Sequence, residues 1–173
     1  SHPSEAIQYL QRVAGAYGIG RDIHIGDTII GIKGRVGFVA AAPMIILKSH
    51  HALEKHVLTK WQLSWKDTLA NFYGNWLHEG QILDPVMRNI EAFFENSQQH
   101  VTGKVFVELQ PYRFQVNGIE SDYDLMNSKF GKYGEMNNGW TGEDVRGFSK
   151  IFGNQTAIWN QVHAPDQKTV DAF

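Results

Sequence analysis

Apolar residues recur at helical spacing through the first half of the chain. A first helix is predicted over residues 3–17, where Pro3 suits a first-turn position. A long helical region begins at Pro43, and Thr59 can cap a second helix within it. This second helix is predicted to end at residues 78–80, where a glycine interrupts the pattern. The first half of the chain is therefore expected to be mainly helical.

Capping signals predict further helices in the second half. Asp84 followed by Pro85 indicates an N-cap and a first-turn proline. Thr141 and Asp144 form the two ends of a predicted capping box, which starts a helix that ends at Gly153. A last short amphipathic helix and a polar tail follow that glycine. The pattern thus predicts that the chain ends in a helical arm.

Alternating apolar and polar residues predict the strands. Residues 27–39 are rich in β-branched side chains interrupted by glycines, which indicates one bent strand or two short ones. Residues 101–109 alternate cleanly and are predicted to pair, after a turn, with a return strand at 114–116. The Gly- and Asn-rich residues 128–142 predict a long surface loop. Together these elements favour an α+β fold, with a mostly antiparallel sheet packed with helices.

Composition and charge narrow the class of protein. The 173 residues are 42% hydrophobic and 20% charged, with a net charge of -2 and no cysteine. The sequence contains no block of basic residues of the kind that would indicate nucleic-acid binding. The longest mostly apolar run, residues 36–47, is much shorter than the roughly 20 residues that a membrane helix needs. We therefore expect no nucleic-acid or membrane partner, and the absence of cysteine favours a cytoplasmic location.

One motif in the strand-rich segment is specific. Gly31, Ile32, Lys33 and Arg35 keep the order of a Gly-(Ile/Met)-Lys-Ser-Arg core, with Gly34 in place of the serine. This core resembles that of the substrate-facing sheet in argininosuccinate synthases. Further matches to that family follow in the same order and at the same spacing, at residues 18–21, 80–85, 97–105, 120–127 and 144–148. The resemblance therefore extends over most of the chain.

The resemblance implies an ATP-dependent ligase of arginine biosynthesis. In the family's reaction MgATP adenylates the ureido oxygen of citrulline, pyrophosphate leaves, and the amine of aspartate then displaces AMP. The family's pyrophosphate-binding loop, Ser-Gly-Gly-x-Asp-x-Ser, does not occur in this sequence. The chain is therefore expected to be the C-terminal portion of a longer enzyme and inactive alone. ATP with Mg would be bound mainly by an N-terminal domain outside it.

The resemblance also implies a homotetramer whose C-terminal helices reach across subunits. On this basis residues 1–141 are predicted to be the C-terminal part of the synthetase, or substrate-binding, domain. Residues 142–173 are predicted to be a helical oligomerisation arm. A non-catalytic oligomerisation or ligand-binding module is the alternative from a different class. The chain does not begin with Met, which favours a fragment, and a Ser-Gly-Gly-type loop upstream of it would exclude the module.

Two positions beside the core depart from the family pattern. The family has a Glu where this chain has Gly26 and a Tyr where it has Phe38, and both family side chains help to hold citrulline. Burying the α-ammonium group of free citrulline without a carboxylate costs several kcal/mol. We therefore expect a citrulline with an acetyl or succinyl group on its α-nitrogen to fit this pocket better. Lys33 or Arg35 could bind a succinyl carboxylate.

Other interpretations of these positions stay open. Asp27 could supply the missing carboxylate if a bulge shifted the strand by one residue. Phe38 could be an ordinary core residue, and Lys33 and Arg35 could be solvated. The substrate that reacts with aspartate is then an N-acylated citrulline, ordinary citrulline, or some other substrate of a paralogue.

A histidine-rich helix face suggests a different kind of site. His50, His51, Glu54 and His56 lie on a predicted helix, with His50 and Glu54 one turn apart. Metal sites use such spacing, but the motif His-Glu-x-x-His is absent. A partly exposed helix face or a subunit contact is the favoured interpretation, and no metal site is predicted. A metal-dependent enzyme centred on His50 and Glu54 ranks third among the functions.

Overall fold

The computed structural model describes residues 2–127 and 139–163. The chain divides into two units, residues 1–127 and residues 128–173, and each is described by itself. Most of the loop predicted at residues 128–142 lies outside the described residues. The predicted functional boundary after residue 141 stays a prediction.

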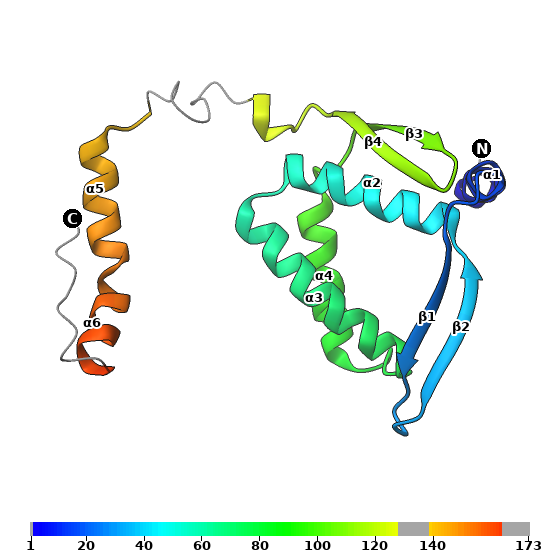
Figure 1. Cartoon of the computed structure of the whole chain (residues 1–173), viewed down its shortest axis with the longest axis horizontal. Helices are drawn as coiled ribbons and strands as arrows, with labels where there is room; N and C mark the ends of the chain where they lie inside the picture. The colour runs from blue at the N-terminus through cyan, green and yellow to red at the C-terminus, as the bar shows by residue number, and fades with distance from the viewer. Residues whose placement is uncertain (1, 128–138, 164–173) are drawn as a thin grey trace. The chain divides into compact units, whose positions relative to one another are not determined.

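The helices described in the first unit are those that the apolar pattern predicts. They are α1 (Pro3–Ala16), α2 (Ala41–Val57), α3 (Lys60–His78) and α4 (Pro85–Gln98) (Figure 1). Helix α2 begins two residues before Pro43, which therefore lies in the first turn, where its missing N–H breaks no helical hydrogen bond. Asp84 caps α4 as predicted, because its side chain accepts a hydrogen bond from the backbone N–H of Val86 at 2.9 Å.

Two antiparallel hairpins complete the first unit, and a short 3-10 turn, η1 (Leu125–Asn127), follows them. One hairpin pairs β1 (Arg21–Asp27) with β2 (Lys33–Val39), and the other pairs β3 (Lys104–Gln110) with β4 (Arg113–Glu120). The α+β prediction with antiparallel strands is confirmed.

The prediction of a strand over residues 27–39 is wrong at its start. Residues 28–32 reverse the chain, and β1 lies wholly before them. The hydroxyl of Thr28 donates to the carbonyl of Ile32 at 2.7 Å, and Gly31 adopts a positive φ of 78°. Because three β-branched isoleucines and a threonine occupy this turn, its composition is typical of a strand although its conformation is not.

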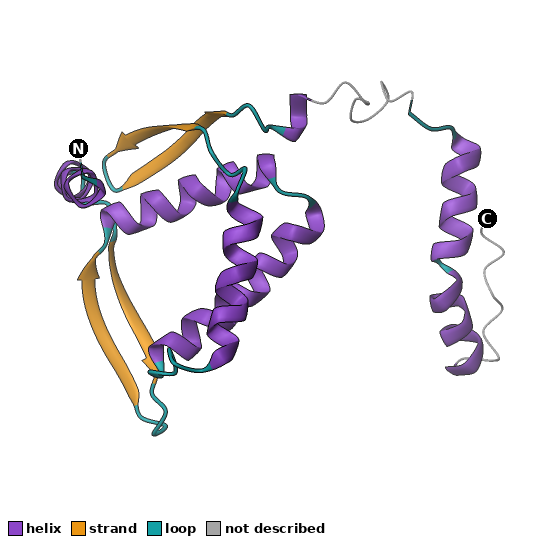
Figure 2. Ribbon diagram, turned by 180° about the vertical axis from the view of Figure 1, so that it is seen from behind, coloured by secondary structure: helices purple, strands orange, loops and turns teal. Residues whose placement is uncertain are grey.

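A hydrophobic core cluster of the first unit lies where α1, the start of α2 and the inner face of the β3–β4 hairpin meet (Figure 2). Its buried members are Ala14, Ile19, Ala41 and Ile45, and Leu10, Val107, Leu109 and Phe114 pack against them. The β1–β2 hairpin extends away from this core, and its residues are exposed apart from the half-buried Gly26 (Figures 1 and 2).

The second unit contributes two described helices, α5 (Gly142–Phe152) and α6 (Asn154–His163). The predicted capping box is confirmed, because the Asp144 carboxylate accepts from the Thr141 N–H at 2.8 Å. This backbone hydrogen bond, with a second from the Thr141 hydroxyl, lowers the pKa of Asp144. The predicted helix end at Gly153 is also confirmed. In the described parts of both units, no helix combines the length and the apolar character needed to cross a membrane.

The Thr59 cap of α3 is a testable contribution to stability. Its hydroxyl accepts from the Gln62 N–H at 3.4 Å, and the Gln62 side chain accepts from the Thr59 N–H at 3.0 Å. Thr59→Ala is expected to lower the free energy of unfolding by about 1 kcal/mol, measured by urea denaturation. Thr68→Ala, at an exposed position inside α3, should leave stability unchanged or slightly raised. An equal loss in both variants would contradict the capping role.

Candidate functional site

The five predicted substrate-binding residues all lie on the β1–β2 hairpin, but on two different faces. Cross-strand partners share a face, and successive residues alternate between faces. One face, the glycine face, carries Asp22, His24, Gly26, Gly34, Val36 and Phe38. The other, the charged face, carries Arg21, Ile23, Ile25, Asp27, Lys33, Arg35, Gly37 and Val39. The register therefore places Gly26 with Phe38, and it separates both from the three predicted charged residues.

The glycine face carries no side chains where Gly26 and Gly34 face each other, and we call this bare area the floor. Gly26 pairs directly with Gly34, so the two positions at which the resemblance led us to expect a polar residue lie opposite each other. A Cβ atom built on Gly34 would meet nothing within 4 Å. Phe38 lies farther along the same face, opposite Asp22, and is 38% exposed. At about 3.3 Å per residue, Phe38 is roughly 13 Å from the glycine pair.

His24 lies over this floor. A Cβ atom built on Gly26 would lie only 2.8 Å from Nε2 of His24 and 3.3 Å from its Cδ2. The imidazole ring therefore occupies the space that a side chain at position 26 would enter. Neither ring nitrogen has a hydrogen-bond partner within residues 2–127 and 139–163.

His24 and Asp22 are candidate site residues that the sequence interpretation missed. It placed the start of the strand at Asp27, so it did not consider the residues before it. The spacing of these residues was the signal. If the strand extends back before Asp27, His24 stands two positions before Gly26 and must share its face.

On the charged face, an ion pair joins the two strands. The ammonium group of Lys33 donates to the carboxylate of Asp27, and both side chains are mostly exposed. Arg35 stands opposite Ile25 and forms no ion pair with any described residue. The register of the hairpin is continuous from Arg21 to Val39, so the bulge that would move Asp27 to the other face is absent from it. Substrate binding by these charged residues stays a prediction.

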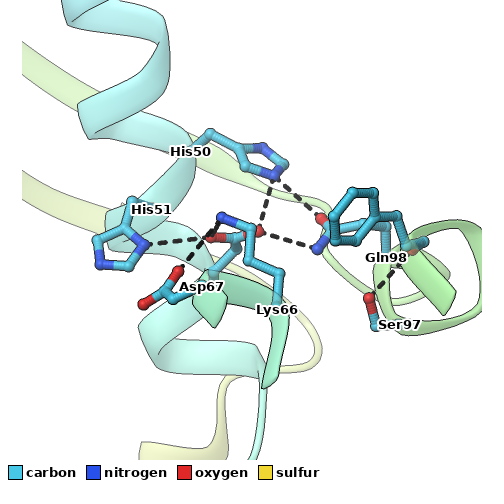
Figure 3. Close-up of polar contacts among 8 residues, drawn as sticks. His50, His51, Lys66, Asp67, Ser97 and Gln98 are labelled. Atoms are coloured by element: carbon cyan, nitrogen blue, oxygen red, sulfur yellow. Dashed lines mark hydrogen bonds and ion pairs between the residues drawn. The ribbon is translucent and has the colours of Figure 1, made fainter. Parts of the chain in front are cut away.

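A second cluster of ionisable side chains surrounds Glu54, at the junction of α2, α3 and α4 (Figure 3). The Glu54 side chain has no solvent exposure. Its Oε2 accepts from Lys66 Nζ at 2.8 Å and lies 3.2 Å from a ring nitrogen of His51. Its Oε1 accepts from the Gln98 amide at 2.9 Å and lies 3.2 Å from His50 Nε2. The helix face is partly exposed as predicted, because the His50 and His51 side chains are 46% and 32% exposed, but its carboxylate is fully buried.

Hydrogen bonds fix the charge of this buried carboxylate. Burial alone would raise the pKa of Glu54, but the hydrogen bonds from His50 and Lys66 and the Lys66 charge lower it to about 2. The hydrogen bond to Glu54 in turn raises the pKa of His50, against the opposing effect of burial. The cluster is an ion-pair network that joins three helices. Within the described residues, no group of three His, Cys, Asp or Glu side chains could hold a metal ion.

Comparison with known proteins places the chain in a family. The family described as "Arginosuccinate synthase C-terminal domain" matches residues 1–159. The argininosuccinate synthase of Dictyoglomus thermophilum is 36% identical over 155 residues, which are 90% of this chain and 39% of that protein. The argininosuccinate synthase of Xanthomonas campestris pv. campestris is 35% identical over 160 residues, 92% of this chain and 40% of that protein. The chain thus spans about two fifths of the length of these relatives.

Proposed function

The chain belongs to the argininosuccinate synthase family, and we propose that it is the substrate-placing, C-terminal part of a ligase that joins a citrulline to aspartate in arginine biosynthesis. ATP with Mg would be bound mainly by the part of such an enzyme that lies outside this chain, because the chain spans only about two fifths of its relatives. The chain alone would be inactive, and the complete enzyme would be a homotetramer.

A substrate-placing role suits the chemistry of this ligase. Adenylation and displacement by an amine depend chiefly on holding the reacting groups in line and on stabilising phosphoryl charge. A hairpin that presents a fixed face to the substrate contributes the first of these. Its part in specificity is to accept or reject the substituent on the α-nitrogen of the citrulline.

The single observation that carries the substrate assignment is the pairing of Gly26 with Gly34. The family's Glu at the first position would meet an α-ammonium group with a carboxylate. Gly26 offers neither charge nor hydrogen-bonding side chain, and Gly34 opposite leaves additional open space. An amide nitrogen carries no charge and its acyl group needs room. We therefore assign an N-acylated citrulline as the substrate.

The hairpin favours an uncharged acyl group such as acetyl over succinyl. A succinyl carboxylate requires a cation, and Lys33 and Arg35 flank Gly34 in the sequence. Both stand on the charged face, and Lys33 already pairs with Asp27. Succinyl binding would therefore need a group other than these two cations.

Free citrulline is the second candidate substrate, and Asp22 favours it. Its carboxylate stands on the glycine face, directly opposite Phe38. One of its oxygens accepts a hydrogen bond from the N–H of Ile23 at 2.7 Å, which leaves the other oxygen for a cation. Asp22 is four residues from Gly26, about 13 Å along the strand. It could therefore serve an α-ammonium group only in a substrate pose shifted from the one expected at Gly26.

Pyrophosphate release by the complete enzyme tests this assignment. With ATP and aspartate present, kcat/KM is expected to be about a hundredfold or more higher for N-acetylcitrulline than for citrulline, because the unpaired ammonium costs several kcal/mol. N-succinylcitrulline is the third substrate to compare. A higher kcat/KM for free citrulline than for both acylated forms would overturn the assignment, and Asp22→Asn should then abolish that preference. Absence of pyrophosphate release with any of the three would favour the non-catalytic module.

A further inference from the structure

We infer that His24 recognises the acyl group on the α-nitrogen of the substrate and thereby adds to the preference for acylated over free citrulline. This inference rests on the proposed function and adds a residue to it. Its basis is the position of the imidazole ring over Gly26, on the glycine face of the β1–β2 hairpin.

The first argument is position. The ring of His24 fills the space that a side chain at position 26 would enter, with Nε2 only 2.8 Å from the site of a Cβ atom. The imidazole therefore stands where the family's carboxylate begins. A group that binds in front of Gly26 meets this ring before it meets any other polar side chain of the strand.

The second argument is hydrogen bonding. A neutral imidazole offers one N–H donor and one acceptor, and both ring nitrogens of His24 lack partners in the described part of the chain. An acylated α-nitrogen presents the matching pair, a carbonyl oxygen that accepts and an amide N–H that donates. The ring therefore suits the acylated substrate.

The third argument is the surroundings of the ring. Val36 stands directly across from His24, and Gly34 lies diagonally opposite with open space above it. The apolar Val36 side chain and the open space over Gly34 would accommodate the methyl or methylene part of an acyl chain, while the His24 ring binds its oxygen. His24 and Gly26 thus act as one unit, because a larger residue at position 26 would displace the ring.

The experiment uses the complete enzyme and measures kcat/KM by pyrophosphate release. The variants are His24→Ala, His24→Asn, which keeps a donor and an acceptor, and Ile23→Ala as a control on the opposite face of the same strand. His24→Ala is expected to lower kcat/KM for acylated citrulline on the order of tenfold and to leave citrulline unchanged. His24→Asn should retain most of the preference, and Ile23→Ala should not change it.

The outcomes separate this inference from the proposed function. If the wild type prefers acylated substrates but His24→Ala lowers kcat/KM equally for all substrates, the role of His24 is overturned and the proposed function stands. A wild type that prefers free citrulline overturns both. Loss confined to N-succinylcitrulline supports binding of its terminal carboxylate by His24, whereas equal loss for both acylated forms supports binding of the amide carbonyl. The double variant His24→Ala/Gly26→Glu should raise kcat/KM for free citrulline, because the new carboxylate then has room.

Discussion

Gly20→Ala is expected to lower the free energy of unfolding by about 3 kcal/mol. Gly20 adopts a positive φ of 78°. A Cβ atom there would lie 2.4 Å from the backbone nitrogen of Ala41 and 2.6 Å from the carbonyl carbon of Ala40. The left-handed conformation costs an alanine roughly 1–2 kcal/mol, and the clash with fixed backbone adds a similar amount.

Urea denaturation of a glycine series separates the two costs. Gly31 has the same φ of 78°, but a Cβ atom there meets nothing within 4 Å, so Gly31→Ala should show only the conformational cost of roughly 1–2 kcal/mol. Gly74 lies within helix α3 with free space around it, so Gly74→Ala should raise stability by up to about 1 kcal/mol. Equal losses for Gly20 and Gly31 would contradict the close backbone approach.

The close approach at Gly20 explains the Gly-Ile-Gly-Arg segment at residues 18–21, which the sequence alone shows only as a resemblance to the family. The carbonyl of Gly20 accepts a hydrogen bond from the N–H of Ala40 at 2.8 Å, which closes the base of the β1–β2 hairpin against the start of α2. Only a residue without a side chain permits this contact. The second glycine of the Gly-Ile-Gly-Arg segment therefore fixes where the candidate site hairpin leaves the core.

The helices could be predicted because their stabilising signals are local. Thr59, Asp84 and Thr141 each cap a helix within three residues of their own position, and the structure confirms all three. The β3–β4 hairpin was equally readable, since Val107 and Leu109 pack on the core while their neighbours face outward.

The start of β1 could not be predicted from the sequence, because burial does not alternate along the β1–β2 hairpin. Both faces are exposed, so apolar Ile23 and Ile25 share the charged face with Asp27, while Val36 and Phe38 stand on the other. Periodicity reports a face only where one side is buried. The family likeness identified the relevant residues, but the distribution of those residues between two faces needed the register.

Long-range contacts were the other feature that the sequence could not supply. The spacing of His50 and Glu54 showed that they share a helix face, and the structure agrees. Lys66 and Gln98 reach the same carboxylate from α3 and α4, 12 and 44 residues along the chain. Only the packing of three helices brings them together and removes Glu54 from solvent.

Glu54→Gln is expected to lower the free energy of unfolding by about 3 kcal/mol at neutral pH. The substitution keeps the shape of the side chain but removes the nearer of the two carboxylates that pair with Lys66, Glu54 at 2.8 Å and Asp67 at 3.6 Å, and the Lys66 side chain is only 21% exposed. It also places an amide N–H₂ where two or more donors converge. Glu120→Gln is the matched control, because its pair with Lys104 is solvent-exposed and worth less than about 1 kcal/mol. Equal effects in urea denaturation would contradict a structural role for the network.

The pH dependence of this difference supplies an independent check. Since the pKa of Glu54 is lowered from 4.5 to about 2, its contribution is present above pH 4.5 and is lost as the pH falls toward 2. The gap in stability between wild type and Glu54→Gln should therefore close over that range. The raised pKa of His50 acts in the opposite direction, because its contribution is lost as the pH rises through that value. Its main cause is the hydrogen bond to Glu54, so NMR titration of Glu54→Gln should show the His50 pKa moving back toward 6.5.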